Sequence, residues 1–318
     1  MAGNTRDYFL RQGFLPMGIN SFPVFKQFDS GGRQFHELTA TVSSIWAFGF
    51  DAVYKIIDGY LCSVWFYKSG HVYFVIQPPR SITAAASLSQ LLDTLYALAA
   101  EAGIPALQLW AVDEGLLADL RQLKAWDVLS EHSEDCSEYV YRTADIIEWN
   151  GGVNLNKRNS LKRCFNTPNI VIRPLTRENF PLCFAVEDEW CIHQDCDSCW
   201  VFAGCLKDSL KNMAEIFDNS IYDGIALYIN GKPMGYAIWE IMDDGAGTKI
   251  AYVYFAKSNV TNFNVYLYYM VAKDYLSVAG VEYVNNGYDM GKPGLRTFKK
   301  HLSVHELMPK YLCTLIHK

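Results

Sequence analysis

The alternation of hydrophobic and polar residues in the first half of the chain predicts a meander followed by alternating helices and strands. Short runs rich in β-branched and aromatic residues are separated by Asp-Gly and Ser-Gly pairs, which are typical of β-hairpins. Leucines at helical spacing predict the helix that follows. The predicted elements are strands at 53–57, 60–67 and 71–76, a helix at 84–100, a strand at 106–111, a helix at 114–124, and closing strands at 126–130 and 138–142.

The second half of the chain repeats this order of elements. Its strand runs are turned by Asn230-Gly231 and by an Asp-Asp-Gly sequence. The predicted elements are strands at 222–229, 232–241 and 249–256, a helix at 262–278, a strand at 281–285, a helix at 295–300 and a final strand within 303–317. We interpret the repetition as a tandem repeat of one α/β unit, and two unrelated α/β domains are the alternative.

The repetition predicts an N-terminal domain at residues 1–150 and a C-terminal domain at 151–318. The first 50 residues are rich in aromatic side chains and predict one or two helices that pack on the first domain. Residues 151–169 predict a basic connecting helix, because Asn154 or Asn156 is a favourable N-cap before a run of lysines and arginines. A strand at 170–173 and helices at about 178–190 and 198–218 follow.

Composition narrows the class of protein. The 318 residues are 50% hydrophobic and 19% charged, which excludes a disordered chain and leaves enough apolar material for two cores. The net charge of -6 argues against a surface covered by nucleic acid, although a local basic cleft stays compatible with it. We expect a cytoplasmic protein without a transmembrane segment, and reduced thiols for its nine cysteines.

The element order and two sequence signatures resemble known proteins. A meander, a crossover helix and a strand–helix–strand unit form the order of the acyl-CoA N-acyltransferase fold known as GNAT, in which the central strands splay apart. The signatures Lys-Arg-Asn-Ser-Leu at 157–161 and Tyr-Asp-Met-Gly-Lys-Pro-Gly-Leu-Arg-Thr-Phe-Lys-Lys at 288–300 resemble a bacterial family related to the C-terminal domain of phosphatidylglycerol lysyltransferase. Trp46 and the segment 54–61 also fit this resemblance.

The resemblance covers nearly the whole chain and implies a fold and an activity. It implies a mixed α+β protein of two tandem GNAT-like domains, each with a mostly antiparallel twisted sheet flanked by helices, as in Fem-type aminoacyltransferases. It also implies transfer of an aminoacyl group from aminoacyl-tRNA, or another phosphate-bearing acyl donor, to an amine or hydroxyl of a small molecule, a peptide or a lipid headgroup. Lipid-modifying relatives carry a large N-terminal membrane domain that this sequence lacks. Among the possible acceptors, we therefore favour a lipid headgroup least.

The sequence does not favour CoA as the donor. GNAT enzymes that use CoA hold its pyrophosphate on the backbone N–H groups of a glycine-containing loop before a helix. The corresponding segments here, 258–266 in the second half and 78–83 in the first, contain no glycine. We therefore expect no cofactor and keep a CoA-dependent N-acyltransferase as the alternative. A non-catalytic binding protein that retains the GNAT cleft is a third hypothesis.

Two basic clusters are candidate phosphate sites. Side chains three and four residues apart share one face of a helix, and Arg and Lys on such a face suit phosphate groups. Solvated charged helix faces are the alternative interpretation. The clusters are Lys157, Arg158, Lys162 and Arg163 in the connecting helix, and Lys292, Arg296, Lys299 and Lys300 near residue 295.

The loop after the last central strand is the candidate catalytic region. Gly291 and Gly294 permit a close approach of a ligand to the backbone, and they are assigned to donor binding. Asp289 is our first candidate for the base that takes a proton from the acceptor, with a turn or cap role as its alternative. Glu240 is the second candidate base. Tyr254 is a candidate proton donor to the leaving group or else a core aromatic.

A cluster of cysteines between two predicted helices raises the question of a metal. Four thiols lie within fifteen residues and His193 stands among them, which resembles a partial zinc site. No second Cys-x-x-Cys pair accompanies them, so we expect no metal and partly buried reduced thiols. The cysteines are Cys191, Cys196, Cys199 and Cys205. The sequence shows no Ser–His–Asp arrangement and no phosphate-binding P-loop.

Overall fold

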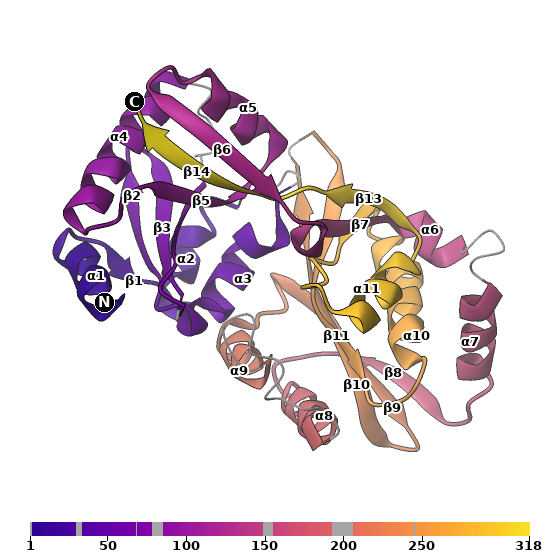
Figure 1. Ribbon diagram of the computed structural model, residues 1–318. Helices are drawn as coiled ribbons and strands as arrows, with labels where there is room; N and C mark the ends of the chain where they lie inside the picture. The colour runs from indigo at the N-terminus through magenta and orange to yellow at the C-terminus, as the bar shows by residue number, and fades with distance from the viewer. Residues whose placement is uncertain are drawn as a thin grey trace.

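A computed structural model of the protein describes residues 2–29, 34–67, 69–77, 85–148, 155–192, 206–244 and 246–318. In these ranges the strands form two seven-stranded sheets, each the centre of one lobe (Figure 1). Both sheets are mostly antiparallel, and each contains one parallel pair of strands. Across the described ranges, no helix combines the length and the apolar character that crossing a bilayer requires.

The first sheet is the predicted meander extended on both sides. Its meander strands pair antiparallel, and the helix α4 carries the chain over to the next strand, which pairs parallel through Phe74 and Leu109. The spatial order is β1 (Leu15–Pro16), β2 (Val53–Ile57), β3 (Tyr60–Phe66), β4 (Val72–Gln77), β5 (Leu107–Val112), β14 (Tyr311–His317) and β6 (Trp126–His132).

The second sheet contains the second predicted meander. Its strands β9, β10 and β11 pair antiparallel, and β11 then pairs parallel with β12. The spatial order is β13 (Val304–Met308), β7 (Glu138–Arg142), β12 (Tyr283–Asn285), β11 (Lys249–Ser258), β10 (Lys232–Asp243), β9 (Tyr222–Ile229) and β8 (Ile170–Pro174).

The two lobes exchange strands. Strand β7 follows β6 in the chain but pairs with β12 and β13 in the second sheet. Strand β14 follows β13 but inserts between β5 and β6 of the first sheet, where Figure 1 shows it in yellow among indigo and magenta elements. The predicted strand at 138–142 therefore exists, but its assignment as a closing strand of the first half was wrong. The domain boundary at residue 150 stays a prediction. Strand β7 precedes this boundary and pairs in the second sheet, whereas β14 follows it and pairs in the first sheet.

Helices cover both sheets and fill the space between them. Helices α1 and α4 contribute to the core of the first lobe, and α10 to the core of the second. All six residues of α3 are buried, and α3 contacts α9 across the two lobes. The helices are α1 (Ala2–Arg11), α2 (Phe22–Phe25), α3 (Ala40–Ile45), α4 (Ala85–Glu101), α5 (Glu114–Gln122), α6 (Thr143–Glu148), α7 (Leu155–Phe165), α8 (Pro181–Ile192), α9 (Leu206–Ile216), α10 (Phe263–Met270) and α11 (Pro293–Lys300).

Two predicted helices differ from those in the structure. The one expected at 262–278 is α10 followed by a π-helical segment, η7 (Val271–Leu276). The one expected at 198–218 is described only as α9, because residues 193–205 lie outside the described ranges.

A buried ion cluster joins the points where the chain passes between the sheets. Lys310 lies between β13 and β14, and Glu138 is the first residue of β7. The Lys310 ammonium lies 3.0 Å from a Glu138 oxygen and 2.7 Å from a Glu37 oxygen, and Lys310 and Glu138 have no exposed surface in their side chains. The rings of Phe35, Trp110 and Tyr288 surround the same ammonium, with centroids at 4.4–5.8 Å. The Lys310 cation therefore connects the two places where the chain passes from one sheet to the other, before β7 and before β14.

We expect Lys310→Met to lower the free energy of unfolding by about 3–5 kcal/mol, because it leaves two buried carboxylates without their cation. Urea unfolding monitored by circular dichroism measures the change. The matched control is Lys318→Met, whose ammonium forms an exposed pair with Asp127 at 3.0 Å and should cause no measurable loss. Equal stability of the two variants would contradict the role given to Lys310.

Candidate functional site

The central strands of the second sheet splay apart. Strand β11 pairs with β12 only through Ile250, Ala251 and Tyr252; β12 ends there at Asn285, whereas β11 continues to Ser258. On its other edge β11 carries a β-bulge, because Trp239 pairs with Val253 and Ile238 pairs with Phe255, which leaves Tyr254 as the extra residue. A bulge twists a strand and frees backbone groups from the ladder. The splay is the cleft that the GNAT-like element order predicts.

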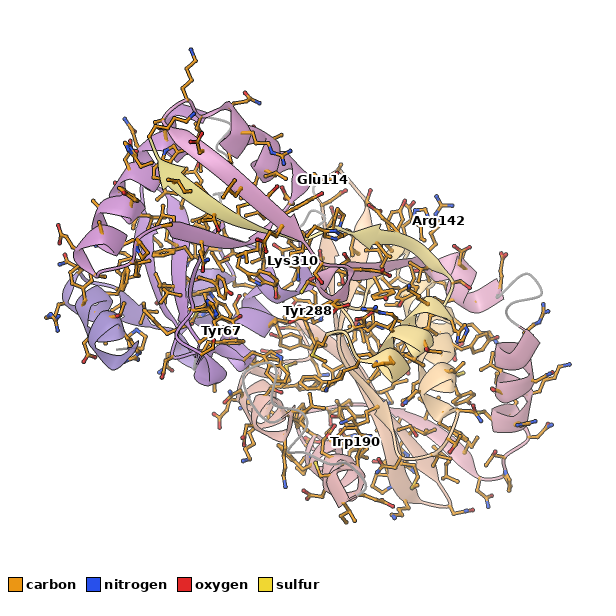
Figure 2. The ribbon with its side chains drawn as sticks, viewed as in Figure 1. Tyr67, Glu114, Arg142, Trp190, Tyr288 and Lys310 are labelled. Atoms are coloured by element: carbon orange, nitrogen blue, oxygen red, sulfur yellow. The ribbon has the colours of Figure 1, made fainter. Side chains whose placement is uncertain are left out.

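A cavity of about 570 Å³ occupies this splay and continues into the first lobe. Its second-lobe wall includes residues 253–257 at the end of β11, residues 286–288 after β12, and residues of α11 as far as Lys299. Its first-lobe wall is largely aromatic and includes Trp46, Trp65 and Trp110. Figure 2 shows Tyr67 in the first lobe and Tyr288 near the junction of the lobes, both among the lining residues.

A single turn of the first lobe lies at this junction and forms hydrogen bonds to residues of both sheets. It is the 3-10 helix η2 (His36–Leu38). The Gln77 side chain, at the end of β4, donates a hydrogen bond to the Leu38 carbonyl at 2.6 Å. His36 Nε2 lies 3.0 Å from the Val253 carbonyl of β11, and the His36 backbone N–H donates to Glu138 at 2.6 Å.

His36 is a neutral hydrogen-bond donor at the apex of the splay. Burial, opposed in part by nearby Glu138, lowers the pKa of His36 to about 4. Because the Val253 carbonyl can only accept, Nε2 carries the proton. Gly287 lies beside this ring with φ of +59°, and a β-carbon there would stand 3.4 Å from His36 Nδ1. That distance is an ordinary contact, so it is the positive φ of this turn that favours glycine at position 287.

Lys299 brings an amine to the wall of the cavity. It is 5% exposed, its Nζ donates to the Asn286 carbonyl, and the same Nζ lies 5.6 Å from the centre of the Tyr139 ring. Burial lowers the pKa of Lys299 to about 7, although Glu138 and Asp289 oppose the shift. The amine is therefore close to half protonated at neutral pH, which suits a group that must accept a proton and return it.

A second lysine lies at the far end of the cleft. Lys257, near the end of β11, has a side chain that is 12% exposed and pairs with Glu187 of α8 at 2.6 Å. Glu187 is fully buried and also accepts a hydrogen bond from the Tyr236 hydroxyl at 2.5 Å. The Lys257 ammonium lies 3.6 Å above the ring of Trp190. All four side chains line the cavity.

Asp289, the first candidate base, lies in the predicted loop but not on the cavity wall. Its carboxylate accepts hydrogen bonds from Tyr139 at 2.6 Å, from Arg296 at 2.8 and 2.9 Å, and from the Gly291 backbone at 2.8 Å. Burial alone would raise the pKa of Asp289, but the bonds from Arg296 and Tyr139 hold it below its ordinary value. These contacts fix the loop onto α11, and they are the turn role given as its alternative.

Glu240, the second candidate base, and Tyr254, the candidate proton donor, lie side by side. The Tyr254 hydroxyl donates to a Glu240 oxygen at 2.8 Å, and Thr41 donates to the same oxygen at 3.1 Å. Lys26 pairs with the other oxygen. Burial raises the pKa of Glu240 despite Lys26. Tyr254 lines the cavity and Glu240 does not, so the pair reaches the cleft only through the tyrosine.

The structure separates the members of the basic clusters. Arg296 pairs with Asp289 and Asp135, and exposed Lys300 pairs with Glu134 at 2.7 Å, whereas Lys299 turns into the cavity with Gly294 nearby. In the connecting helix α7, Arg158 is half-buried and Lys162 is exposed, and the side chain of Lys157 lies outside the described part. Figure 1 shows α10 between α7 and α11, so the clusters do not share one surface.

Several cavity residues have no counterpart in the sequence interpretation. His36, Glu37 and Lys257 are isolated charged or polar residues in segments without a motif, so no local signal marked them. Cys191 lies in α8 and is half-buried, and the candidate ligands Cys196, Cys199 and Cys205 lie outside the described residues. The expectation of reduced thiols without a metal at this cluster therefore stays a prediction.

Two lobes, each with a mostly antiparallel sheet flanked by helices, define a protein of the tandem GNAT-like class, with mixed α+β architecture. Within it, residues 34–314 match the family described as phosphatidylglycerol lysyltransferase, C-terminal, and the chain belongs to this family. The match confirms the resemblance drawn from the two signatures. A lysyltransferase is by its name an acyltransferase. Among curated proteins, none has a matching sequence.

Solved structures show the same fold. A conserved protein of Bacteroides thetaiotaomicron is 19% identical with a TM-score of 0.80, and the match covers 95% of this chain and 99% of that one. The L-PGS of Bacillus licheniformis is 13% identical with a TM-score of 0.60, covering 94% and 92% of the two chains. FemX is 10% identical with a TM-score of 0.53, covering 84% and 87%. At these identities the likeness establishes the fold alone.

The pKa of Lys299 predicts a pH dependence of stability. Between its folded value of about 7 and the ordinary value of 10.5, the unfolded chain binds more protons, so the free energy of unfolding rises with pH. In the unmodified protein this rise in the free energy of unfolding approaches about 1.4 kcal/mol per pH unit. We expect the Lys299→Met variant to lack it. Urea unfolding between about pH 7.5 and 9.5 measures it.

Lys300→Met is the matched control, because Lys300 is the next residue of α11 and forms an exposed pair with Glu134. It should keep the slope of the unmodified protein. A Lys299→Met variant with that same slope would show that the amine titrates normally in the folded state.

Proposed function

We propose that this protein transfers an aminoacyl group from an aminoacyl-tRNA-like donor to an amine or hydroxyl acceptor. The observation that carries the proposal is a cavity that passes through the splay of β11 and β12 beside an amine with a pKa near neutrality. Membership of a family described by a lysyltransferase supports it. An aminoacyl ester is already activated, so the protein must supply mainly position, charge stabilisation and proton transfer.

Lys299 is the proton carrier in this proposal. Its neutral amine takes the proton of the attacking amine or hydroxyl as the nucleophile adds to the ester carbonyl. The bond between the carbonyl carbon and the ribose oxygen then breaks, and the Lys299 ammonium returns the proton to that oxygen. The products are an amide or ester and an RNA with a free hydroxyl. Backbone N–H groups of β11, on the edge beyond its pairing with β12, are the candidate hydrogen-bond donors to the carbonyl oxygen.

The loop between β11 and α10 argues against CoA as the donor. Its backbone groups are engaged by the loop itself: the Val260 N–H donates to Ser258 Oγ at 3.1 Å, and the Phe263 N–H donates to the Val260 carbonyl at 3.1 Å. The Asn259 side chain donates to the Val186 carbonyl at 2.9 Å. A pyrophosphate needs such N–H groups to be available. We therefore propose a reaction without CoA.

A transfer assay tests the proposal. Transfer RNA charged with labelled amino acids is incubated with the protein and a panel of amines and alcohols, and label leaving the RNA for an acceptor is measured. A parallel reaction contains labelled acetyl-CoA. We expect transfer from RNA and none from acetyl-CoA. Transfer from acetyl-CoA alone would support a CoA-dependent N-acyltransferase, and transfer from neither donor would support a non-catalytic binding protein.

We expect Lys299→Met to lower kcat for the transfer by about 100-fold or more, because proton transfer by a positioned group contributes about 10²–10⁴-fold. Lys299→Arg should be equally slow, because a guanidinium does not release its proton near neutral pH. Lys318→Met serves as the control and should retain full activity, because this exposed lysine pairs with Asp127 and does not line the cavity. Full activity of Lys299→Arg would exclude proton transfer by this residue and leave only a role for its charge.

A further inference from the structure

We propose that the first-lobe arm of the cavity is the acceptor subsite and that it binds a compact organic ammonium compound with an apolar body. The assignment as acceptor subsite rests on the proposed function, whereas the binding of the ammonium compound is independent of it. The arm is defined by Glu37, Phe50, Trp65, Tyr67 and Trp110 of the first lobe together with Tyr288.

The walls of this arm form a continuous aromatic surface. The rings of Phe50 and Trp65 lie 4.7 Å apart between centroids, and those of Phe50 and Tyr67 lie 4.9 Å apart. Trp110 lies across the arm in β5 and is connected to Tyr67 through the ring of Tyr73, at 5.0 and 6.2 Å. Aromatic faces attract organic cations through their quadrupoles and also bury apolar groups well.

A local irregularity of β5 sets the position of Trp110. Strand β14 pairs Tyr311 with Val112 and Cys313 with Leu109, so β5 contains one residue more than its partner there. Ala111 takes up the irregularity with φ of +58°, a conformation that residues with a β-carbon rarely adopt. A bulge of this kind redirects a side chain and is frequent beside binding sites. The strain at Ala111 is consistent with a functional orientation of Trp110.

The charges of the cavity are distributed unequally between its two arms. Among the described lining residues, the charged side chains are Glu187, Lys257 and Lys299 in the second lobe and Glu37 in the first, since His36 is neutral. The second-lobe arm thus offers two amines against one carboxylate. Among the described residues, the lining of the first-lobe arm offers a carboxylate and includes no lysine or arginine. In this described part of the arm an ammonium group finds an anion, whereas a phosphate headgroup finds no cation.

Glu37 shares its cation with a second carboxylate. Glu37 and Glu138 both pair with Lys310, and the Glu37 side chain keeps 14% of its surface exposed while the other two keep none. Burial raises the pKa of Glu37 and the neighbouring Glu138 raises it further, although Lys310 opposes the shift. The other described titratable groups that influence this cluster include Tyr67, Tyr288, Cys136, His36 and Lys299. An ammonium compound in the arm places a second cation beside Glu37 and favours its charged form.

The inference fits the chemistry of the proposed reaction. The bound ammonium loses one proton to solvent to become an amine, and a second proton passes to Lys299 as the nitrogen bonds to the ester carbonyl carbon. The carbonyl–ribose oxygen bond breaks, and Lys299 returns its proton to the ribose oxygen. An amide and a free RNA hydroxyl result. Lys299 lies on the second-lobe wall of the same cavity that the first-lobe arm opens into.

Calorimetric titration of the whole protein with three probes of similar size tests the binding. The probes are 2-phenylethylammonium, the neutral 2-phenylethanol and the anionic 3-phenylpropionate, and glycerol 3-phosphate represents a phosphate headgroup. We expect the ammonium to bind at least ten times more tightly than the alcohol, and no binding of either anion. Equal binding of ammonium and alcohol, or tighter binding of an anion, would overturn the proposal.

Variants locate the site. Glu37→Gln should weaken ammonium binding at least ten-fold and leave the alcohol unaffected, whereas Trp110→Leu should weaken both. Glu134→Gln removes an exposed carboxylate outside the cavity and should change neither. Thermal unfolding of each variant checks that it is folded, and Trp110→Leu still tests the arm if Glu37→Gln is not. Unchanged ammonium binding in both cavity variants would place the probe elsewhere.

The two proposals fail in different ways. If the ammonium compound binds as described but no aminoacyl group is transferred to it or to any other acceptor, the proposed function is wrong and the binding site stands. If transfer occurs to alcohols or phosphate headgroups while 2-phenylethylammonium does not bind, the function stands and the ammonium subsite is wrong.

Discussion

The Lys310 ammonium, held between Glu138 and Glu37 without contact with water, is the interaction on which the arrangement of the two lobes depends. Removing an ion pair from water costs free energy, and the cost is offset here by two carboxylates and three aromatic rings around one cation. The cluster lies where β7 and β14 leave one lobe for the other. It therefore fixes the register of the strand exchange, and with it the angle between the sheets.

The cavity follows from that arrangement. In the second sheet the parallel pair β11–β12 is open at one end, and the turn His36–Leu38 is bonded to β11 of this sheet and to the end of β4 in the first sheet. One wall of the cavity is therefore an edge of the second sheet and the other is an aromatic face of the first. Neither lobe alone contains a closed site. The same junction places Lys299 within a low-dielectric environment, which is the physical reason for its lowered pKa.

Sequence reasoning predicted the elements that depend on local signals and missed those that depend on partners. The hairpins at Asp58-Gly59 and Asn230-Gly231 were predictable because turn chemistry is local. The partners of 138–142 were not, because Val140 and Tyr141 would be buried in either sheet. At the site, the region of Tyr254, Lys299 and Gly294 was predicted. His36, Glu37 and Lys257 were not, since single residues in unpatterned segments acquire their role only from the fold.

The exchange of strands has a consequence for how the protein is made. On the ribosome, residues up to 132 emerge with every strand of the first sheet except the one that belongs between β5 and β6. That gap is filled by residues 311–317, which are synthesised nearly two hundred residues later. During translation the edges of β5 and β6 stay exposed to other chains, and such edges invite mispairing. The late arrival of one strand makes the nascent first lobe a natural client for chaperones that shield sheet edges.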